Sequence, residues 1–344
     1  MMLRRIAKKE GLNVEPGTIF IKDNLSIMRC MNSDCIDLIY LDPPFNKNKT
    51  FTALMDSKAK GAEFKDYWER DDVKDADMDY LEKAHEELFA LLKVLRGLGI
   101  RGSEYYLYYI ALRLLECHRV LKPTGSIYLH CDPTMSHYLK LLMDCIFGVE
   151  NFRNEIVWFY PDTPGRARRY FPKKHDLLLC YSKSRNYTFE AKNVLIDILP
   201  ESKMRYKTPR KIGGREYIGG KSSTEGKIPE DVWRIPAVKG NSKEYIGYPT
   251  QKPEKLLDRI IKASSQEGDV VLDPFCGCAT TCVVAHGLHR KWIGIDLSPV
   301  AGEMVLSRLH DRGSLDYKIV IWNDKTNKAD VLPVRTDLRD IPSS

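Results

Sequence analysis

Short apolar runs alternate with amphipathic stretches along most of this chain, and the alternation predicts an α/β fold. Buried strands are predicted at residues 18–21, 36–41, 126–130, 270–272 and 292–296, and two hairpin-like strands near 155–160 and 176–181. Helical spacing predicts helices at residues 25–31, 80–95, 105–121, 135–147 and 253–264. Strands that alternate with helices favour a doubly wound, mostly parallel sheet.

Two regions depart from this pattern. Residues from about 185 to 245 are rich in Gly, Pro, Lys and Arg, which is typical of loops. The end of the chain, 323–344, shows no clear apolar core. We therefore expect one domain in two halves, 1–184 and 246–322, with a loop-rich insert at 185–245 and a tail or linker at 323–344.

Two unusual turns directly follow predicted strands. Asp42-Pro43-Pro44-Phe45 comes after strand 36–41, and Asp273-Pro274-Phe275-Cys276-Gly277 comes after strand 270–272. Two consecutive prolines cannot continue a strand or a helix, so the chain must turn there. Doubly wound sheets bind ligands beyond the carboxyl ends of their strands, which makes both turns candidates for a functional site.

The second turn has features of a nucleoside-binding loop. Gly277 lets the backbone approach a ligand closely, and Asp296 ends the next predicted strand 19 positions later. An acidic residue at about that spacing can accept hydrogen bonds from ribose hydroxyls. A dinucleotide fits less well, because the third glycine of a G-x-G-x-x-G loop is missing. A purely structural turn is the alternative at this point.

The first turn suits methylation of an exocyclic amine on a base. Such an amine is a weak nucleophile because its lone pair is delocalised into the ring, and two acceptors aimed at its hydrogens favour the reactive form. The Asp42 carboxylate and the Pro43 carbonyl can be those acceptors, Pro44 would stiffen the loop, and Phe45 would stack on the base. The alternative for Asp42 is a turn or cap residue. Methylation of cytosine C5 is disfavoured, because it uses a cysteine that follows a proline and no cysteine here does so.

Positive charge is concentrated in the middle of the chain. Residues 151–262 contain 24 Lys and Arg against 13 Asp and Glu, whereas the remaining residues contain 30 against 34. A solvated basic face would explain this excess. A surface for a polyanion such as DNA would explain it equally well.

The other compositional features favour a cytoplasmic protein. No apolar stretch approaches the roughly 20 residues of a membrane span, and the basic N-terminus is not followed by an apolar signal core. None of the nine cysteines lies in a C-x-x-C pair. We therefore expect reduced core thiols and no metal site.

With both turns identified, the sequence resembles the amino-methylating DNA methyltransferases of restriction–modification and orphan systems, from about residue 18 to residue 310. The Asp42 turn precedes the Asp273 turn, an order similar to that of the family's β group. Residues 119–128, 154–158 and 248–253 also resemble family segments. Cys276-Gly277-Cys278 departs from the pattern, since glycines are more usual there.

The resemblance implies a Rossmann-like, S-adenosylmethionine-dependent methyltransferase fold, with S-adenosylmethionine as the cofactor. It implies that Asp23 meets the cofactor adenine and that Thr250 and Lys252 hold the cofactor's amino-acid end. The expected cofactor-binding residues are Asp23, Asp42, Thr250, Lys252, Asp273, Pro274, Phe275, Gly277, Thr280 and Asp296. The expected catalytic residues are Asp42, Pro43, Pro44 and Phe45, and Trp158 or Tyr160 would complete a pocket for a flipped base.

The resemblance also places target recognition in the insert at 185–245, between a catalytic half and a cofactor-binding half. The expected DNA contacts, mainly to phosphates, are Arg166, Arg168, Arg169, Lys207, Arg210 and Lys211. Double-stranded DNA is the expected partner. Family habit adds a homodimer and a cognate restriction endonuclease.

Three alternatives stay open. N4 of cytosine is also an amine, but by the resemblance an Asp at position 42 favours N6 of adenine, whereas a Ser favours cytosine. Methylation of RNA or of a protein amide is disfavoured because the related loops begin with Asn. A catalytically inactive DNA-binding module would keep the fold and lose Asp42 or the cofactor loop, and neither is lost. The predicted reaction is therefore N6-adenine methylation of DNA.

Overall fold

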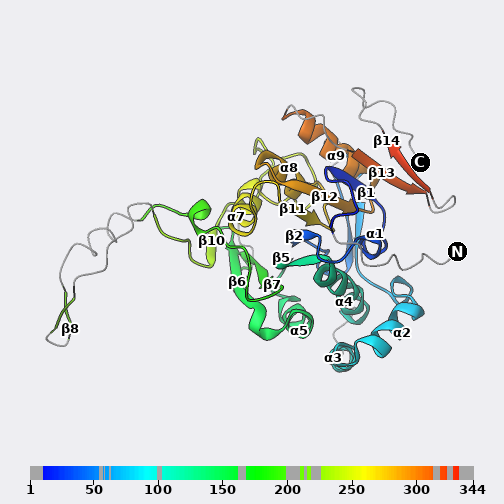
Figure 1. Cartoon of the computed structure of the whole chain (residues 1–344), viewed down its shortest axis with the longest axis horizontal. Coiled ribbons are helices and arrows are strands. Elements are labelled where there is room, and N and C mark those ends of the chain that lie inside the picture. Colours follow the sequence, from blue (N-terminus) through cyan, green and yellow to red (C-terminus); the bar gives the residue numbers. More distant parts are fainter. Residues whose placement is uncertain are drawn as a thin grey trace.

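A large, doubly wound sheet organises the molecule (Figure 1). The computed structural model describes residues 11–53, 57, 59–61, 63–98, 103–161, 168–198, 210–212, 215–217, 226–312, 318–323 and 328–332. Within these residues, ten strands pair in the order β10-β6-β7-β5-β2-β11-β12-β1-β13-β14. β7 and β14 run antiparallel to their neighbours, and all other neighbouring pairs are parallel. The predicted fold class is confirmed.

The predicted strands are present with bounds close to those expected. They are β1 (Thr18–Ile21), β2 (Ile36–Leu41), β5 (Leu121–Cys131), β6 (Phe152–Phe159), β7 (His175–Ser182), β11 (Val270–Asp273) and β12 (Lys291–Asp296). The strands that were not predicted are β3 (Lys49–Thr52), β4 (Glu63–Asp66), β8 (Arg210–Ile212), β9 (Arg215–Tyr217), β10 (Val232–Arg234), β13 (Lys318–Asn323) and β14 (Lys328–Leu332). β3 pairs with β4 and β8 with β9, each in a small hairpin outside the main sheet.

β14 corrects the expectation of a tail or linker from residue 323 onward. Its residues 328–332 pair antiparallel with β13 and form one edge of the main sheet. The sequence Lys-Ala-Asp-Val-Leu shows little apolar periodicity. An edge strand can form without it, because backbone hydrogen bonds to the neighbouring strand hold it in the sheet. β10 likewise joins residues 232–234 of the predicted insert to the opposite edge, beside β6.

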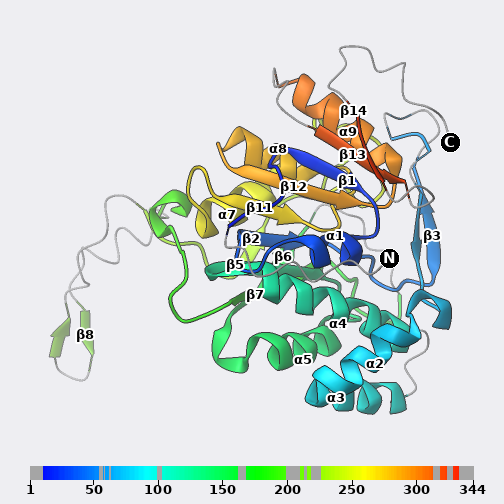
Figure 2. The same cartoon turned by 45° about the vertical axis from the view of Figure 1, so that its right-hand side comes forward.

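Helices cover both faces of the sheet (Figures 1 and 2). One layer contains α1 (Asn24–Cys30), α2 (Asp75–Ala84), α3 (Glu86–Gly97), α4 (Ser103–Val120) and α5 (Ser136–Phe147), and the other contains α7 (Glu254–Ser264), α8 (Thr280–Gly287) and α9 (Pro299–His310). Short 3₁₀ helices span Arg70–Asp72, Val149–Asn151 and Ala191–Val194. The predicted helix over 80–95 is two helices, because the backbone leaves the helical region at His85 (φ −142°, ψ 58°).

Each face of the sheet packs against its own core. In β5, the side chains of Ile127 and Leu129 lie in the core with α4 and α5, whereas Tyr128 lies in the core with α7 and α8. This alternation is the period of a β-strand, and it buries the sheet on both faces. Ligands can therefore reach the sheet only at the ends of its strands.

β2 and β11 are parallel neighbours at the centre of the sheet, with Leu38 beside Val271 and Ile39 beside Leu272. Asp42 follows one strand and Asp273 ends the other, so the two turns emerge side by side. β5 continues the sheet beyond β2, and β12 continues it beyond β11. The connections from β2 and from β11 therefore run to opposite sides of the sheet. Doubly wound sheets bind ligands at such a switch point.

Candidate active site

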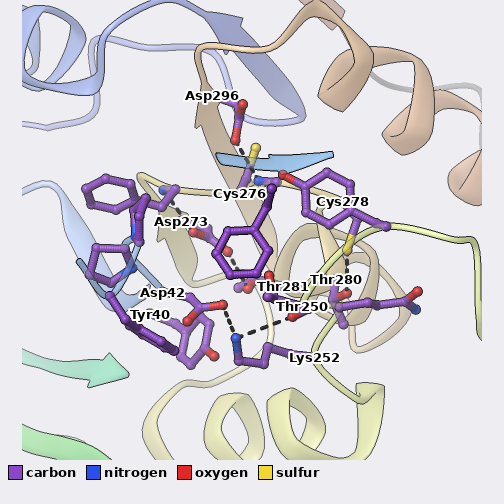
Figure 3. A pocket seen from close by; sticks show the side chains of 18 of the residues that line it. Tyr40, Asp42, Thr250, Lys252, Asp273, Cys276, Cys278, Thr280, Thr281 and Asp296 are labelled. Atoms are coloured by element: carbon purple, nitrogen blue, oxygen red, sulfur yellow. Dashed lines mark hydrogen bonds and ion pairs between the residues drawn. The ribbon is translucent and has the colours of Figure 1, made fainter. Parts of the chain in front are cut away.

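A cleft lies at the carboxyl ends of β2 and β11, and both turns line it (Figure 3). Its empty volume is about 800 Å³, open mouth included. It brings together most of the residues predicted for catalysis and cofactor binding, namely Asp42, Pro43, Pro44, Phe45, Thr250, Lys252, Asp273, Phe275, Gly277, Thr280 and Asp296. Residues from the β3–β4 hairpin and from the loop before α7 complete its walls, among them Lys47, Phe51, Asp66, Tyr248 and Gln251.

Asp42 and Lys252 form an ion pair inside the cleft, between Oδ2 and Nζ. Their side chains are only 18% and 8% exposed. The Lys252 ammonium also lies 3.4 Å from the carbonyl oxygen of Thr250. Lys252 precedes α7, so the pair ties the first turn to a segment more than 200 residues away and holds the carboxylate toward the cleft.

Phe45 turns one ring face against the protein interior. Its ring stacks on the His130 imidazole, with centroids 5.7 Å apart and an interplanar angle of 26°. The ammonium groups of Lys47 and Lys252 lie 4.9 and 5.4 Å from the ring centre. Phe45 is therefore held from one side by a buried ring and lies beside positive charge at the cleft.

Trp158 and Tyr160 lie behind Phe45 rather than in the wall of the cleft. The Trp158 indole is buried and donates a hydrogen bond of 2.8 Å to the carbonyl oxygen of Ile235. The Tyr160 hydroxyl donates to Asp176 Oδ1 over 3.1 Å. The two rings contact each other, with centroids 5.1 Å apart. Trp158 contacts the His130 ring, with centroids 5.5 Å apart, so the pair packs behind the imidazole on which Phe45 stacks. Their role beside a flipped base stays a prediction.

The second turn carries the buried carboxylate of Asp273, and the half-buried carboxylate of Asp296 lies beside it at the end of β12. Asp273 accepts hydrogen bonds from the Thr281 hydroxyl (2.5 Å) and from the Phe275 N–H (3.1 Å). Burial raises the pKa of Asp273 to about 7, and the negative charges of Asp42 and Asp296 add to the rise. Asp296 accepts from the Gly277 N–H (2.8 Å), and burial raises its pKa as well.

The backbone of the cleft is left-handed at three places, and two of them are occupied by residues other than glycine. Gly277 (φ +49°), Ala279 (φ 54°) and Thr250 (φ 63°) are all in the left-handed region. A side chain at Gly277 would also meet the Tyr248 ring at 3.2 Å. Left-handed Ala and branched Thr cost on the order of 1 kcal/mol or more each, and such strain clusters at ligand sites.

Four carboxylates, those of Asp42, Asp66, Asp273 and Asp296, thus line one cleft, which suits a ligand with positive charge and hydroxyl groups. A family model described as DNA methylase, of the N6/N4 type, matches residues 36–305 of the chain. The chain belongs to the N6/N4 DNA methylase family.

Curated relatives and solved structures agree with this assignment. The DNA adenine methyltransferase YhdJ of Escherichia coli (strain K12) is 30% identical over 296 residues, which cover 86% of this chain and 83% of the relative. The type II methyltransferase M.HpaI of Haemophilus parainfluenzae is 30% identical over 285 residues, which cover 83% and 71%.

Two solved structures show the same fold. The cytosine-N4-specific PvuII DNA methyltransferase matches with a TM-score of 0.53 at 15% identity, covering 87% of this chain and 89% of its own. TTHA0409 of Thermus thermophilus, solved with S-adenosyl-L-methionine, matches with a TM-score of 0.50 at 16% identity, covering 89% and 99%. The methylase therefore has the Rossmann-like fold of S-adenosylmethionine-dependent methyltransferases.

Two predicted cofactor-binding residues of the methylase do not line the cleft itself. Asp23 caps α1 by accepting from the Ser26 N–H (3.2 Å), and it forms an ion pair with Arg113. The Pro274 carbonyl accepts from the Asn24 side chain over 2.6 Å. Both residues belong to a contact between α1 and the second turn, next to the carboxyl end of β12.

The predicted DNA contacts of the methylase fall into three groups. Arg166 and Lys207 lie outside the described residues. Arg168 and Arg169 are exposed in the turn between β6 and β7. β5 and β6 are both antiparallel to β7, so β6 runs parallel to β5 and to β2. The turn after β6 therefore lies at the carboxyl ends of the parallel strands, as the cleft does. Arg210 and Lys211 are in β8, in a hairpin with β9.

Sequence reasoning missed several residues around the cleft. Asp66 is almost fully buried and accepts a hydrogen bond from the Asn46 N–H, and burial raises its pKa to about 6. His130 contacts Phe45 of the first turn from behind, and Asp176 lies 3.2 Å from His130 Nε2. A signal existed for His130, which follows an apolar run at the carboxyl end of its strand, as Asp42 does. Asp66 follows no such run, because the β3–β4 hairpin lies outside the sheet.

Three further observations concern metal binding, the thiols and the helices of the methylase. Within the described part of the chain, no group of three or more His, Cys, Asp or Glu side chains is arranged to hold a metal ion. Cys276, Cys278 and Cys282 are buried free thiols. Among the described helices, none is long and apolar enough to cross a membrane.

Proposed function

We propose that this methylase transfers a methyl group from S-adenosylmethionine to N6 of adenine in double-stranded DNA. The observation that carries the proposal is the Asp42 carboxylate, fixed by Lys252 in the cleft that Asp273 and Asp296 also line. The cleft fits the cofactor, which bears a sulfonium, an ammonium group and ribose hydroxyls. When bound, S-adenosylmethionine supplies an electrophilic methyl group.

The residues of the second turn would hold this cofactor. A carboxylate offers about four acceptor sites, so Asp296 can bind ribose hydroxyls while it keeps the Gly277 N–H. The left-handed Gly277 lets the ligand approach the backbone. Thr250 and Lys252 border the part of the cleft nearest Asp42 and would receive the amino-acid end.

The first turn would hold the target base. Asp42 and the Pro43 carbonyl would accept from the two amine hydrogens, and Phe45 would stack on the base. Rotating a base out of the duplex costs a few kcal/mol, which such contacts offset. Adenine is favoured because an Asp begins the turn and because the relative YhdJ is named an adenine methyltransferase. N4 of cytosine is the second candidate, since the PvuII enzyme with the same fold is cytosine-N4-specific.

The proposal extends to the partners of the methylase. Arg168 and Arg169, on the edge of the sheet that bears the cleft, would contact DNA phosphates. A cognate restriction endonuclease is proposed because M.HpaI, a relative, is named a type II methyltransferase. A homodimer stays a prediction from the family.

Product analysis tests the proposal. Purified protein is incubated with plasmid DNA and S-adenosylmethionine, and the DNA is digested to nucleosides for mass spectrometry. We expect 6-methyladenine. A 4-methylcytosine peak without 6-methyladenine contradicts the choice of base. Labelled methyl groups in RNA or protein, with none in DNA, contradict the substrate class.

A further inference from the structure

A buried chain of hydrogen bonds lies directly behind the Asp42 turn and joins three strands. His130 of β5 is 0% exposed and is the centre of this chain. Its Nδ1 lies 2.9 Å from the hydroxyl of Tyr40 in β2, and its Nε2 lies 3.2 Å from Oδ2 of Asp176 in β7. Tyr160 donates to the other oxygen of Asp176. Both imidazole nitrogens are therefore occupied inside the protein.

The hydrogen bonds from Tyr40 through His130 to Asp176 have one consistent assignment of donors and acceptors. Burial works to raise the pKa of Asp176, but hydrogen bonds from His130 and Tyr160, with the positive charge of Lys252, hold it below its ordinary value. The carboxylate is therefore an acceptor, and His130 Nε2 must donate to it. Burial raises the pKa of Tyr40 well above its ordinary value, so the hydroxyl keeps its proton and donates to Nδ1.

The imidazole touches both groups that would hold the target base. Phe45 stacks on it, and Asp42 Oδ1 lies 4.0 Å from its Nδ1. Tyr40 and Asp42 are two residues apart at the end of β2, so the same strand carries the chain's donor and the carboxylate. Because hydrogen bonds at both nitrogens fix the plane of the imidazole, they also fix the surface on which Phe45 rests.

We propose that His130, locked by Tyr40 and Asp176, is a positioning residue that sets the orientation of Phe45 and Asp42 toward the target base. This inference rests on the proposed function and adds to it a residue that positions the Asp42 turn. Loss of the lock leaves the Asp296 side of the cleft intact, so cofactor binding is retained while methyl transfer slows. A displacement of about 1 Å at reacting groups can cost on the order of 100-fold in rate.

The sheet provides a matched pair of variants for the test. Tyr40 and Tyr128 are register partners on β2 and β5, and both are buried in the same core. The Tyr40 hydroxyl bonds His130, whereas the Tyr128 hydroxyl bonds Ser264 Oγ at 2.7 Å and leads away from the cleft. Tyr40→Phe and Tyr128→Phe therefore each remove one buried hydroxyl, and only Tyr40→Phe removes a hydrogen bond to His130.

Single-turnover methylation and calorimetric binding of S-adenosylmethionine are measured for both variants, with melting temperature as a check on folding. We expect similar drops in melting temperature and unchanged cofactor affinity. Tyr40→Phe should slow methyl transfer about tenfold, and Tyr128→Phe should stay within about twofold of the parent. His130→Ala should lower the rate further, again with cofactor affinity retained.

Equal rates for the two tyrosine variants overturn the proposal, because the lock would then have no influence on transfer. Cofactor affinity that falls in step with the rate in Tyr40→Phe also overturns it, because the chain would then be a general support of the cleft. If the unaltered protein methylates no DNA, the proposed function itself has failed. That result is distinguishable, since it precedes any comparison of variants.

Discussion

The two turns that form the cleft have equivalent positions in the fold, but their aspartates differ in exposure and in the groups that bind them. Each begins with an Asp-Pro pair at the end of a buried, parallel strand. Asp42 is 18% exposed and carries its own cation, Lys252. Asp273 is 3% exposed, is bound by a hydroxyl and an N–H, and has its pKa raised to about 7. One carboxylate is already neutralised by the protein, and the other is suited to a cation supplied by a ligand.

The backbones of the two turns differ in the same sense. Pro43 and Pro44 make the first turn stiff, which suits acceptors that must hold a fixed position. Left-handed Gly277 and Ala279 shape the second turn and the start of α8, and their N–H groups donate to Asp296 and to the Cys276 carbonyl. Similar strand ends therefore carry turns of different backbone conformation.

The largest expected effect comes from removing Asp42, which distinguishes the role of the first turn in transfer from that of the second turn in cofactor binding. Asp42→Ala should lower methyl transfer by about 1,000-fold or more, because the target amine loses its charged acceptor. Cofactor affinity should change by only a few-fold. Methylation assays and calorimetry measure the two quantities, and an equal loss of both would make Asp42 a structural residue.

The reciprocal variant, Asp296→Ala, should act mainly on cofactor affinity. It removes the ribose acceptor and the partner of the Gly277 N–H, and hydrogen bonds to charged groups contribute about 1.5–3 kcal/mol. We expect S-adenosylmethionine to bind about 10- to 100-fold more weakly. Transfer at saturating cofactor should recover most of its rate, and a rate that stays as low as that of Asp42→Ala contradicts the division of roles.

The raised pKa of Asp273 predicts how the cofactor half responds to pH. A cation bound nearby favours the ionised carboxylate, so S-adenosylmethionine should bind more tightly as pH rises from 6 to 8, by about tenfold in all, with the gain levelling off above pH ~7. For the free protein the sign is opposite. Its folded state favours neutral Asp273, so this residue's contribution to stability is full below pH ~4 and declines as pH rises through about 7.

Asp273→Asn provides the comparison for this pH dependence. It should flatten the affinity profile and remove part of the pH dependence of chemical denaturation between pH 5 and pH 8. Cofactor affinity that does not vary with pH in the unaltered protein would show that Asp273 does not sense the ligand's charge.

The smallest expected effects concern the turn between β6 and β7, which is proposed to contact DNA. Arg168→Ala and Arg169→Ala should each weaken DNA binding several-fold and reduce the slope of log affinity against log salt by about 1. Arg96→Ala is the control, because Arg96 is exposed on α3, outside both the predicted insert and the β6–β7 turn. Binding titrations at several salt concentrations should separate the first two variants from the third. Equal slopes for all three would remove the β6–β7 turn from the DNA interface.

Much of the site was predictable because it lies where long apolar runs stop. β2 and β11 are unmistakable in the sequence, and the rule for parallel sheets places Asp42 and Asp273 at one edge. The partner of Asp42 could not be deduced from physical reasoning on the sequence. Lys252 was assigned to the cofactor by resemblance, and its ion pair depends on how α7 packs against the sheet.

Other features that the sequence did not show have similar physical causes. Trp158 and Tyr160 lie behind Phe45, where β10 pairs with β6 and the Ile235 carbonyl takes the indole N–H, which turns Trp158 inward. β14 is an edge strand with little apolar signal. Such features depend on contacts between distant segments, which periodicity along the chain does not report.

A crystal structure with S-adenosylhomocysteine, the product of the cofactor, tests most directly whether the two turns form one catalytic cleft. The expected result places ribose hydroxyls on Asp296 and the sulfur facing the Asp42 side. A ligand bound elsewhere, or one whose sulfur points away from Asp42 and Phe45, would contradict the account.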